Sequence, residues 1–482
     1  MLSITLLAIV MTISSVESTS AASACASYNA LDNTITVTCD TTISKIAAEI
    51  NNTAALEEDS PKVWILRAIL TVGSDAHLTI NSSDVQWLKI TVNNTLGNSS
   101  NTDGPNRIEL YGTATFNNTK ITSWDETANS EVQQLPDASI VRPFIKIGKG
   151  GGTADISNSE LGYLGYEGDP KSHGLTYDEG GDGSVITNSS FHHMSYGIHP
   201  EGVGLMLENN DFHSNVVYGI NAHGSPYIFV NNNRIYNNTG SAGMIFSQNS
   251  AHLMIENNEV YNNTNRGIRF SDNTHDSVIR NNTIYNQENA ISINSSPRNQ
   301  IFDNIIKDSR YGITLQTVSK EIDPEALCNR CGYSEVDAKS INNTVLGNDI
   351  QNAETAIRIK DNSTIHNLFE GNSLSDNRNH VTIESATYNT FRNNDIGPAT
   401  QNEFKIEDDT KIVLENQSFT DDRIKGENGT NVVIIVDSGD IEVRNDSTDD
   451  EGQDTTAHNT NESPYTHKLT DNEVIVADSK SS

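Results

Sequence analysis

A dipeptide that returns at nearly constant intervals constrains the fold of this chain more than any other sequence feature. Glycine or alanine followed by an apolar residue recurs in steps of 22 to 24 residues, at Gly174-Leu175, Gly197-Ile198, Gly219-Ile220, Gly243-Met244, Gly267-Ile268, Ala290-Ile291 and Gly312-Ile313. A second phrase of two asparagines and a short strand-like word keeps the same period, as in Asn232-Asn233-Arg234-Ile235. Strand-like words separated by turn residues at a fixed period are typical of a solenoid, so we predict an all-β parallel β-helix.

The period also suggests how the chain is divided. Residues 1–24 contain a short apolar run and small residues, which is typical of a secretory signal peptide, and residues 25–60 are expected to form an N-terminal cap with one amphipathic helical stretch. The β-helix is expected over residues 61–397. The period is lost after that, so residues 398–445 are predicted as a strand-containing extension and residues 446–482 as an acidic, partly disordered low-complexity tail.

One interruption breaks the regular coils. Gly312 and Ala356 are 44 residues apart, which equals two periods and predicts an atypical coil between them, with an inserted loop at about residues 320–340. The loop carries Cys328 and Cys331 in a C-x-x-C pattern. A zinc site would need two more ligands, so a disulfide within the loop is the preferred interpretation.

The other two cysteines indicate an oxidising compartment. Cys25 and Cys39 flank a hairpin-like segment, and a disulfide between them is expected outside the cytoplasm. Asn-x-Ser/Thr sequons are abundant, among them Asn51, Asn81 and Asn117, which suits a glycoprotein. We therefore expect a secreted or cell-surface protein with no transmembrane segment after signal removal.

The net charge limits the partners. A formal charge of -33 argues against binding to nucleic acid or to an anionic membrane surface. A polyanionic substrate would require cations or a local basic patch to screen this charge. A cation is compatible with a polar groove on such a fold, but no ligand spacing specifies Ca²⁺. The oligomeric state is not specified by the sequence.

The position of each recurring Gly predicts which side chains point into the core and which point outward. Strand residues alternate between the two faces, so the first and third residues after each Gly are expected to point into the core and the second and fourth to point outward. This places Asp178, Glu201 and His223 one above another on adjacent coils, with His199 and Asn221 beside them and Arg269 two or three coils further along.

Such a column has the residue types for acid–base chemistry. Carboxylates and imidazoles within a few ångströms exchange protons with a bound substrate, and an arginine binds an anion. Our candidate catalytic residues are Asp178, Glu201, His199 and His223, and our candidate substrate-binding residues are Arg269 and Asn221. The alternative is that these are ordinary polar residues on a solvated strand face.

Several phrases resemble one family. They are Arg142-Pro143-Phe144, Gly150-Gly151-Gly152, Leu161-Gly162-Tyr163-Leu164-Gly165-Tyr166 and Tyr196-Gly197-Ile198-His199-Pro200-Glu201. Together with the repeats, over roughly Trp64 to Leu315, they resemble the secreted alginate (mannuronan) C5-epimerases, which are right-handed parallel β-helices with carbohydrate-binding and sugar-hydrolase repeats. The resemblance implies a uronate-containing polysaccharide as substrate and removal of its C5 proton.

The chain departs from that family at its catalytic motif. The family has Asp-Pro-His-Asp directly after Tyr-Gly-Ile, whereas this chain has His199-Pro200-Glu201-Gly202. The family's base histidine therefore falls on Glu201 and its first aspartate on His199, while His223 lies close to where the family has an arginine. Either the site has been rebuilt around Glu201 and His223, or the epimerase activity has been lost.

Three hypotheses follow from this departure. The first is a polysaccharide-modifying enzyme, an epimerase first and a lyase second. The second is a non-catalytic secreted β-helix that binds a cell-surface or matrix glycan along the same face. The third is a structural component of a cell surface.

Overall fold

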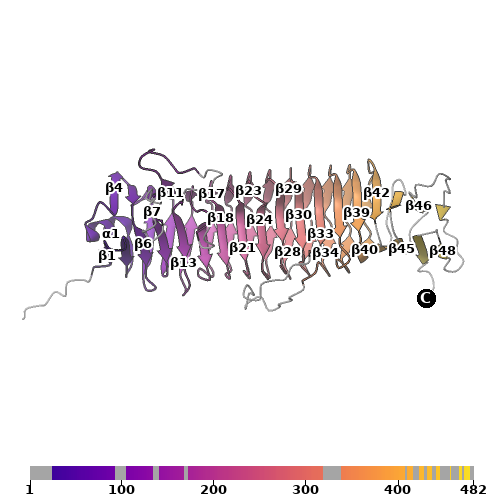
Figure 1. Ribbon diagram of the computed structural model, residues 1–482, viewed down its shortest axis with the longest axis horizontal. Helices are drawn as coiled ribbons and strands as arrows, with labels where there is room; N and C mark the ends of the chain where they lie inside the picture. The colour runs from indigo at the N-terminus through magenta and orange to yellow at the C-terminus, as the bar shows by residue number, and fades with distance from the viewer. Residues whose placement is uncertain are drawn as a thin grey trace, which may run out of the picture.

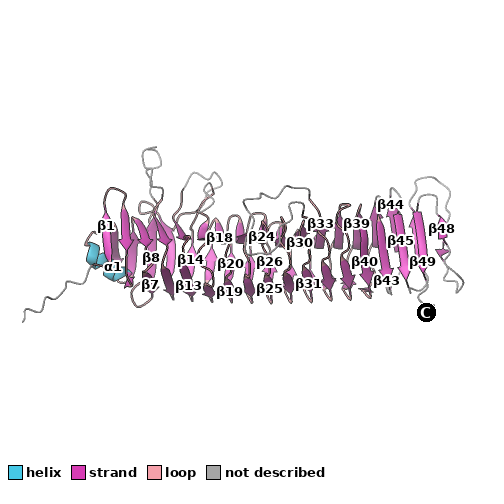
Figure 2. Ribbon diagram, turned by 90° about the horizontal axis from the view of Figure 1, so that it is seen from below, coloured by secondary structure: helices cyan, strands magenta, loops and turns pink. Residues whose placement is uncertain are grey.

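The chain folds into an elongated stack of coils (Figures 1 and 2). The computed structural model describes residues 24–92, 105–133, 141–167, 172–318, 338–407 and 410–415, and the backbone of six further strands between residues 423 and 477. Three sheets, named A, B and C here, run along the stack, and strands from successive coils pair in parallel within each of them. The prediction of a parallel β-helix is confirmed.

The strands divide among the three sheets in a regular order. Sheet A contains β1 (Ala26–Asn29), β2 (Thr34–Val37), β6 (Ile69–Val72), β9 (Arg107–Leu110), β12 (Phe144–Ile147), β15 (Gly174–Asp178), β18 (Tyr196–Glu201), β21 (Tyr218–His223), β24 (Ala242–Ser247), β27 (Arg266–Phe270), β30 (Asn289–Asn294), β33 (Tyr311–Gln316), β36 (Thr355–Lys360), β39 (Asn379–Glu384), β42 (Asn402–Glu407), β44 (Arg423–Glu427), β46 (Ile441–Asn445) and β47 (Thr456–Ala457). Sheet B contains β3 (Thr41–Thr42), β7 (His77–Asn81), β10 (Thr113–Asn117), β13 (Thr153–Ser157), β16 (Val185–Thr187), β19 (Met206–Glu208), β22 (Phe229–Asn231), β25 (Met254–Glu256), β28 (Val278–Arg280), β31 (Gln300–Phe302), β34 (Thr344–Leu346), β37 (Leu368–Glu370), β40 (Thr387–Arg392), β43 (Lys411–Glu415), β45 (Asn431–Val436), β48 (Thr466–Lys468) and β49 (Asn472–Ala477). Sheet C contains β4 (Leu56–Ser60), β5 (Val63–Leu66), β8 (Trp87–Thr91), β11 (Lys120–Trp124), β14 (Glu160–Gly162), β17 (Ser190–His192), β20 (Asp211–His213), β23 (Arg234–Tyr236), β26 (Glu259–Tyr261), β29 (Thr283–Tyr285), β32 (Ile305–Lys307), β35 (Asp349–Gln351), β38 (Ser373–Ser375) and β41 (Asp395–Ile396).

The recurring Gly-Ile phrase lies on sheet A, and its alternation is the one expected. Ile198 and Ile220 are fully buried in the core, and they pair directly across β18 and β21. The glycine before each isoleucine lies where the backbone of the next coil approaches closely. A Cβ atom on Gly197 would lie 2.5 Å from the carbonyl oxygen of Gly219, which explains why this position recurs as glycine.

Buried asparagines join the coils between sheets B and C. In this asparagine ladder each Nδ2 donates to the Oδ1 of the asparagine one coil further on, for example Asn233 to Asn258 at 3.1 Å and Asn258 to Asn282 at 2.9 Å. The same Oδ1 atoms accept backbone N–H groups from the preceding coil. These asparagines are therefore part of the architecture, because they satisfy buried backbone donors at every turn.

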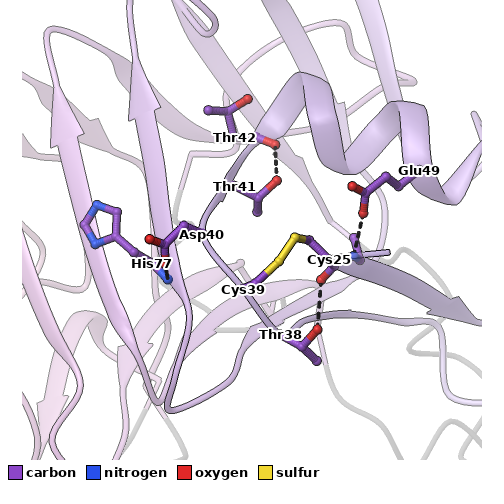
Figure 3. The surroundings of a disulfide bond; sticks show 9 residues. Cys25, Thr38, Cys39, Asp40, Thr41, Thr42, Glu49 and His77 are labelled. Atoms are coloured by element: carbon purple, nitrogen blue, oxygen red, sulfur yellow. Dashed lines mark hydrogen bonds between the residues drawn. A yellow bond between two sulfur atoms is a disulfide. The ribbon is translucent and has the colours of Figure 1, made fainter. Parts of the chain in front are cut away.

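The N-terminal end is closed by a hairpin and the short helix α1 (Ile43–Ile50). The disulfide predicted between Cys25 and Cys39 is present and flanks this hairpin of β1 and β2 (Figure 3). The Glu49 carboxylate on α1 accepts a hydrogen bond from the backbone N–H of Ala26, which ties the helix to the hairpin. No helix in the described part of the chain has the length and apolar character needed to cross a membrane.

The expectation of an atypical coil between Gly312 and Ala356 is wrong. β33 pairs directly with β36, with Ile313 opposite Ile357, so the two strands belong to adjacent coils. The 44-residue spacing reflects one coil with a long insertion. The predicted disulfide between Cys328 and Cys331 lies in that insertion, outside the described residues.

Strand pairing continues beyond the point where the sequence period ends. β42 pairs in parallel with β39 and then with β44, and β43 continues sheet B in the same way. The predicted boundary near residue 397 therefore coincides with the loss of the asparagine and glycine phrases, whereas the sheets extend further.

Candidate functional site

Three of the predicted site residues form one column on the outward face of sheet A. Asp178 at the end of β15 lies opposite Glu201 on β18, and Glu201 lies opposite His223 on β21. Neighbouring strands of a sheet are about 4.8 Å apart, so the three side chains stand on successive steps of that size. The structure thus brings together the groups that the repeat predicts.

His199 lies beside this column and its protonation is fixed by one contact. Its Nδ1 atom is 2.9 Å from the backbone carbonyl oxygen of Asn221, and because a carbonyl only accepts, Nδ1 carries the proton. Nε2 is then the nitrogen that takes up a proton, and it lies 4.0 Å from Oε2 of Glu201. This distance is too long for a hydrogen bond, so a proton can pass between the imidazole of His199 and the carboxylate of Glu201 through one bridging water.

Two residues of this cluster were missed by the sequence reasoning. The ring of His173 stacks on Tyr196 with centroids 4.1 Å apart, and it meets the ring of His199 edge-on at 4.8 Å. His223 meets His199 edge-on from the other side at 4.9 Å. The available signal was the residue before each recurring Gly, a position that holds His173, Tyr196 and Tyr218 on successive coils.

The outward residues are more buried than a solvated strand face implies. His199 and Asn221 are each only 2% exposed and Asp178 only 5%, whereas the Glu201 side chain is 32% exposed. Burial, with smaller contributions from Tyr218 and Glu167, raises the pKa of Tyr196, so its phenol stays protonated at neutral pH. Glu201 is thus the carboxylate of the column that reaches solvent.

A lysine that the sequence analysis did not predict supplies positive charge to this cluster. Lys146 on β12 points its Nζ at Asp178, with 3.2 Å between Nζ and Oδ2. Lys146 pairs across the sheet with Thr176 on β15, and Thr176 pairs with His199. The cluster therefore combines a partly buried ion pair at one end with proton-carrying groups at the other.

Arg269 stands apart from this cluster. The row that runs through His199 continues with Asn221 on β21, Ile245 on β24 and Arg269 on β27. Three strand steps separate Arg269 from His199, which amounts to about 14 Å. The structure therefore places the predicted arginine on the same face, but not next to Glu201.

The hollows of the surface do not coincide with this cluster. A cavity of about 570 Å³ lies at the turn between sheets B and C, where Lys120, Glu160 and Asp211 line it among asparagine and serine side chains. This cavity lies along the turns between sheets B and C and contains none of the clustered residues. The candidate site is therefore the side-chain cluster on sheet A. Within the described residues, no three His, Cys, Asp or Glu side chains are arranged to hold a metal ion.

Part of this chain is similar to a known family and to a known enzyme. Residues 174–325 match the family described as right-handed β-helix region. The mannuronan C5-epimerase of Pseudomonas fluorescens is 26% identical over 206 residues, which is 40% of this chain and 36% of that protein. This chain thus matches little more than a third of the length of its curated relative.

A solved structure supports the same relation at the level of the fold. The crystal structure of the periplasmic alginate epimerase AlgG superposes with a TM-score of 0.64 at 20% identity, covering 75% of this chain and 84% of that chain. At this identity the likeness shows the fold alone. The chain is a right-handed parallel β-helix protein that is similar to a mannuronan C5-epimerase over part of its sequence.

Proposed function

We propose that this protein modifies a uronate-containing polysaccharide at C5 of the sugar ring, as a C5-epimerase or as a lyase. The observation that carries the proposal is the succession of Asp178, Glu201 and His223 on adjacent strands, with His199 within reach of Glu201. The relation to a mannuronan C5-epimerase supports the choice of a uronate polymer. The Cys25–Cys39 disulfide supports a location outside the cytoplasm, where such polymers occur.

The reaction needs one base, one cation and one acid. The base removes the proton at C5, and the electron pair left behind spreads into the sugar carboxylate, where a cation offsets the added negative charge. A proton delivered to the opposite face of C5 gives the epimer. If the C4–oxygen bond breaks instead, the same intermediate gives an unsaturated chain end.

Glu201 and His223 fit the proton-transfer roles. Glu201 or His223 takes the C5 proton, and the other residue or water returns one. His199 takes the proton on from Glu201 at Nε2 through one bridging water, because Nε2 and the carboxylate are 4.0 Å apart and Nδ1 already donates to the carbonyl of Asn221. Lys146, paired with Asp178, suits the cation's role better than Arg269, which stands three strands from His199.

Substitution tests these assignments directly. We expect Glu201→Gln and His223→Ala each to lower turnover of polymannuronate by about 10²- to 10⁴-fold, the usual contribution of a positioned acid or base. His213→Phe on sheet C is the matched control, because it removes an outward imidazole from another face. Full activity in both site variants, with intact circular dichroism spectra, would sink the assignment.

The altered motif favours a second candidate, which is glycan binding without catalysis. His199-Pro200-Glu201-Gly202 occupies the slot where the related enzymes carry Asp-Pro-His-Asp. In that case polymannuronate binds along sheet A without any change in its uronate composition. Proton NMR of the polymer after incubation separates the two candidates.

A further inference from the structure

Two arginines on the outward face of sheet A differ from the other arginines of this acidic protein. Of the arginines whose side chains the structure describes, Arg142 donates to backbone carbonyls and all others except Arg266 and Arg269 have a carboxylate oxygen within 4.0 Å. Arg266 and Arg269 lie on the same strand, β27. Carboxylates greatly outnumber cationic side chains in a protein with a net charge of -33. It is therefore unusual that neither Arg266 nor Arg269 has a carboxylate partner.

The two arginines also have buried atoms without hydrogen-bond partners. The Nε atoms of Arg266 and Arg269 are buried and have no hydrogen-bond acceptor. A buried donor without an acceptor costs about 1–3 kcal/mol, more when the group is charged. Burial, and after it the positive charge of Arg269, lowers the pKa of Arg266, while Tyr218 and Glu288 act in the opposite direction. An anion bound at the exposed ends of the two guanidinium groups would offset the cost of holding their charges close together.

Unsatisfied polar atoms recur along the same face, from β15 to the end of β27. Thr176 Oγ1, Asn221 Oδ1 and Ser271 Oγ are also buried without a hydrogen-bond partner. Between Asn221 and Arg269 the row contains Ile245, which is 7% exposed and gives the face one apolar position. A strip of polar atoms with an apolar position between them suits a sugar chain, whose rings have hydroxyl edges and C–H faces.

We propose that Arg266 and Arg269 form a carboxylate subsite that binds a uronate unit about three sugars away from the unit at Glu201. This deepens the proposed function and rests on it. A hexopyranose polymer advances by roughly one strand spacing for each sugar, and β27 lies three strands from β18. Guanidinium groups bind carboxylates through two parallel hydrogen bonds, which selects carboxylate-bearing polymers over neutral ones.

The subsite makes binding depend on chain length. An oligomer long enough to reach from Glu201 to β27 gains the arginine contacts, whereas one shorter than about four units does not. For long polymannuronate we expect Arg269→Gln and Arg266→Gln each to weaken binding about tenfold, a typical value for a charge-assisted hydrogen bond. Short oligomers should bind the variants and the wild-type protein equally.

Calorimetric titration with polymannuronate, a series of its oligomers, neutral dextran and dextran sulfate tests the subsite without any need for turnover. Arg280→Gln is the matched control, because this substitution removes the same charge from the same coil. Arg280 lies on sheet B, where it pairs with Glu256. Arg269→Lys keeps the charge without the fork and should lie between Arg269→Gln and the wild type. Circular dichroism verifies that each variant is folded.

The outcomes of this titration separate the subsite from the proposed function. Equal affinity of Arg269→Gln and Arg280→Gln for long polymannuronate overturns the subsite, even if the wild-type protein turns the polymer over. Arginine-dependent binding of long chains without turnover supports the subsite and contradicts the enzyme. Tighter binding of dextran sulfate than of polymannuronate overturns the assignment of a carboxylate.

Discussion

Replacing Asn233 with alanine removes one rung of the asparagine ladder that joins neighbouring coils. Oδ1 of Asn233 accepts the backbone N–H of Asn210 at 2.8 Å and Nδ2 of Asn210 at 3.1 Å, and its own Nδ2 donates to the carbonyl oxygen of Leu207 at 2.9 Å. Asn210 is 1% exposed, so its two donors would lose their acceptor where little water reaches them. At about 1–3 kcal/mol for each of the two orphaned donors, we expect a loss of about 2–6 kcal/mol in local stability.

Native-state hydrogen exchange is the appropriate assay, because a solenoid opens locally and need not unfold in one step. Protection should fall most at the amide of Asn210 and in the coils on either side of Asn233. The matched control is Asn232→Gly, which removes an exposed neighbouring carboxamide at a positive φ of 55° that glycine tolerates. Equal protection in the two variants would contradict the view that the buried ladder stabilises the coils.

Three further perturbations test separate parts of the structure. Burial, and after it the charge of His192, lowers the pKa of His213 to about 4, so the folded state resists protonation and the free energy of unfolding should fall as the pH drops from 6.5 to 4. His213→Phe keeps the ring stack with Tyr236 and should lose about 1 kcal/mol less over that window in urea titrations, a value discounted for partial exposure; identical pH profiles would refute this. Cys39→Ser should cost about 2–4 kcal/mol in the N-terminal cap, seen as a lower melting temperature equal to that of Cys25→Ser, with no further loss in the double variant; additive losses would argue against the Cys25 pairing. Gly197→Val should cost about 1–3 kcal/mol in chemical denaturation, because its Cβ would lie 2.5 Å from the Gly219 carbonyl oxygen, and an unchanged midpoint would contradict that close contact.

The periodic part of the site could be predicted from the sequence. Strand alternation starting from each Gly-Ile separates Ile198, which is buried in the core, from Glu201, which faces outward. A fixed period then puts Glu201 opposite both Asp178 and His223, as the register of β15, β18 and β21 confirms. Because the backbone repeats, the column follows from counting alone.

Contacts of side chains outside the alternating positions that follow each Gly could not be predicted in the same way. His173 and Tyr196 precede the recurring Gly, and their rings lie over His199 and help to bury it. The ion pair of Lys146 with Asp178 joins strands on either side of a stretch that the period does not cover. These contacts depend on rotamers and on loop paths, which a repeat length does not encode.

The spacing of repeats also left one ambiguity that only pairing resolves. A gap of two periods between Gly312 and Ala356 fits either an extra coil or a single coil with an insertion. The register of Ile313 with Ile357 decides for the insertion. The sequence likewise gives no reason to single out Arg266. Only the structure shows that Arg266 lies near Arg269 and that the Nε atoms of both side chains lack a hydrogen-bond acceptor.

Proton exchange at C5 tests the central claim most directly. Polymannuronate is incubated in deuterated water with the wild-type protein and with Glu201→Gln, and deuterium at C5 and unsaturated chain ends are measured by NMR and ultraviolet absorbance. We predict that the wild-type protein incorporates deuterium at C5 or produces unsaturated ends, and that Glu201→Gln does neither at a comparable rate. Polymannuronate recovered without deuterium and without new ends from the wild-type protein, although it binds, would contradict the account.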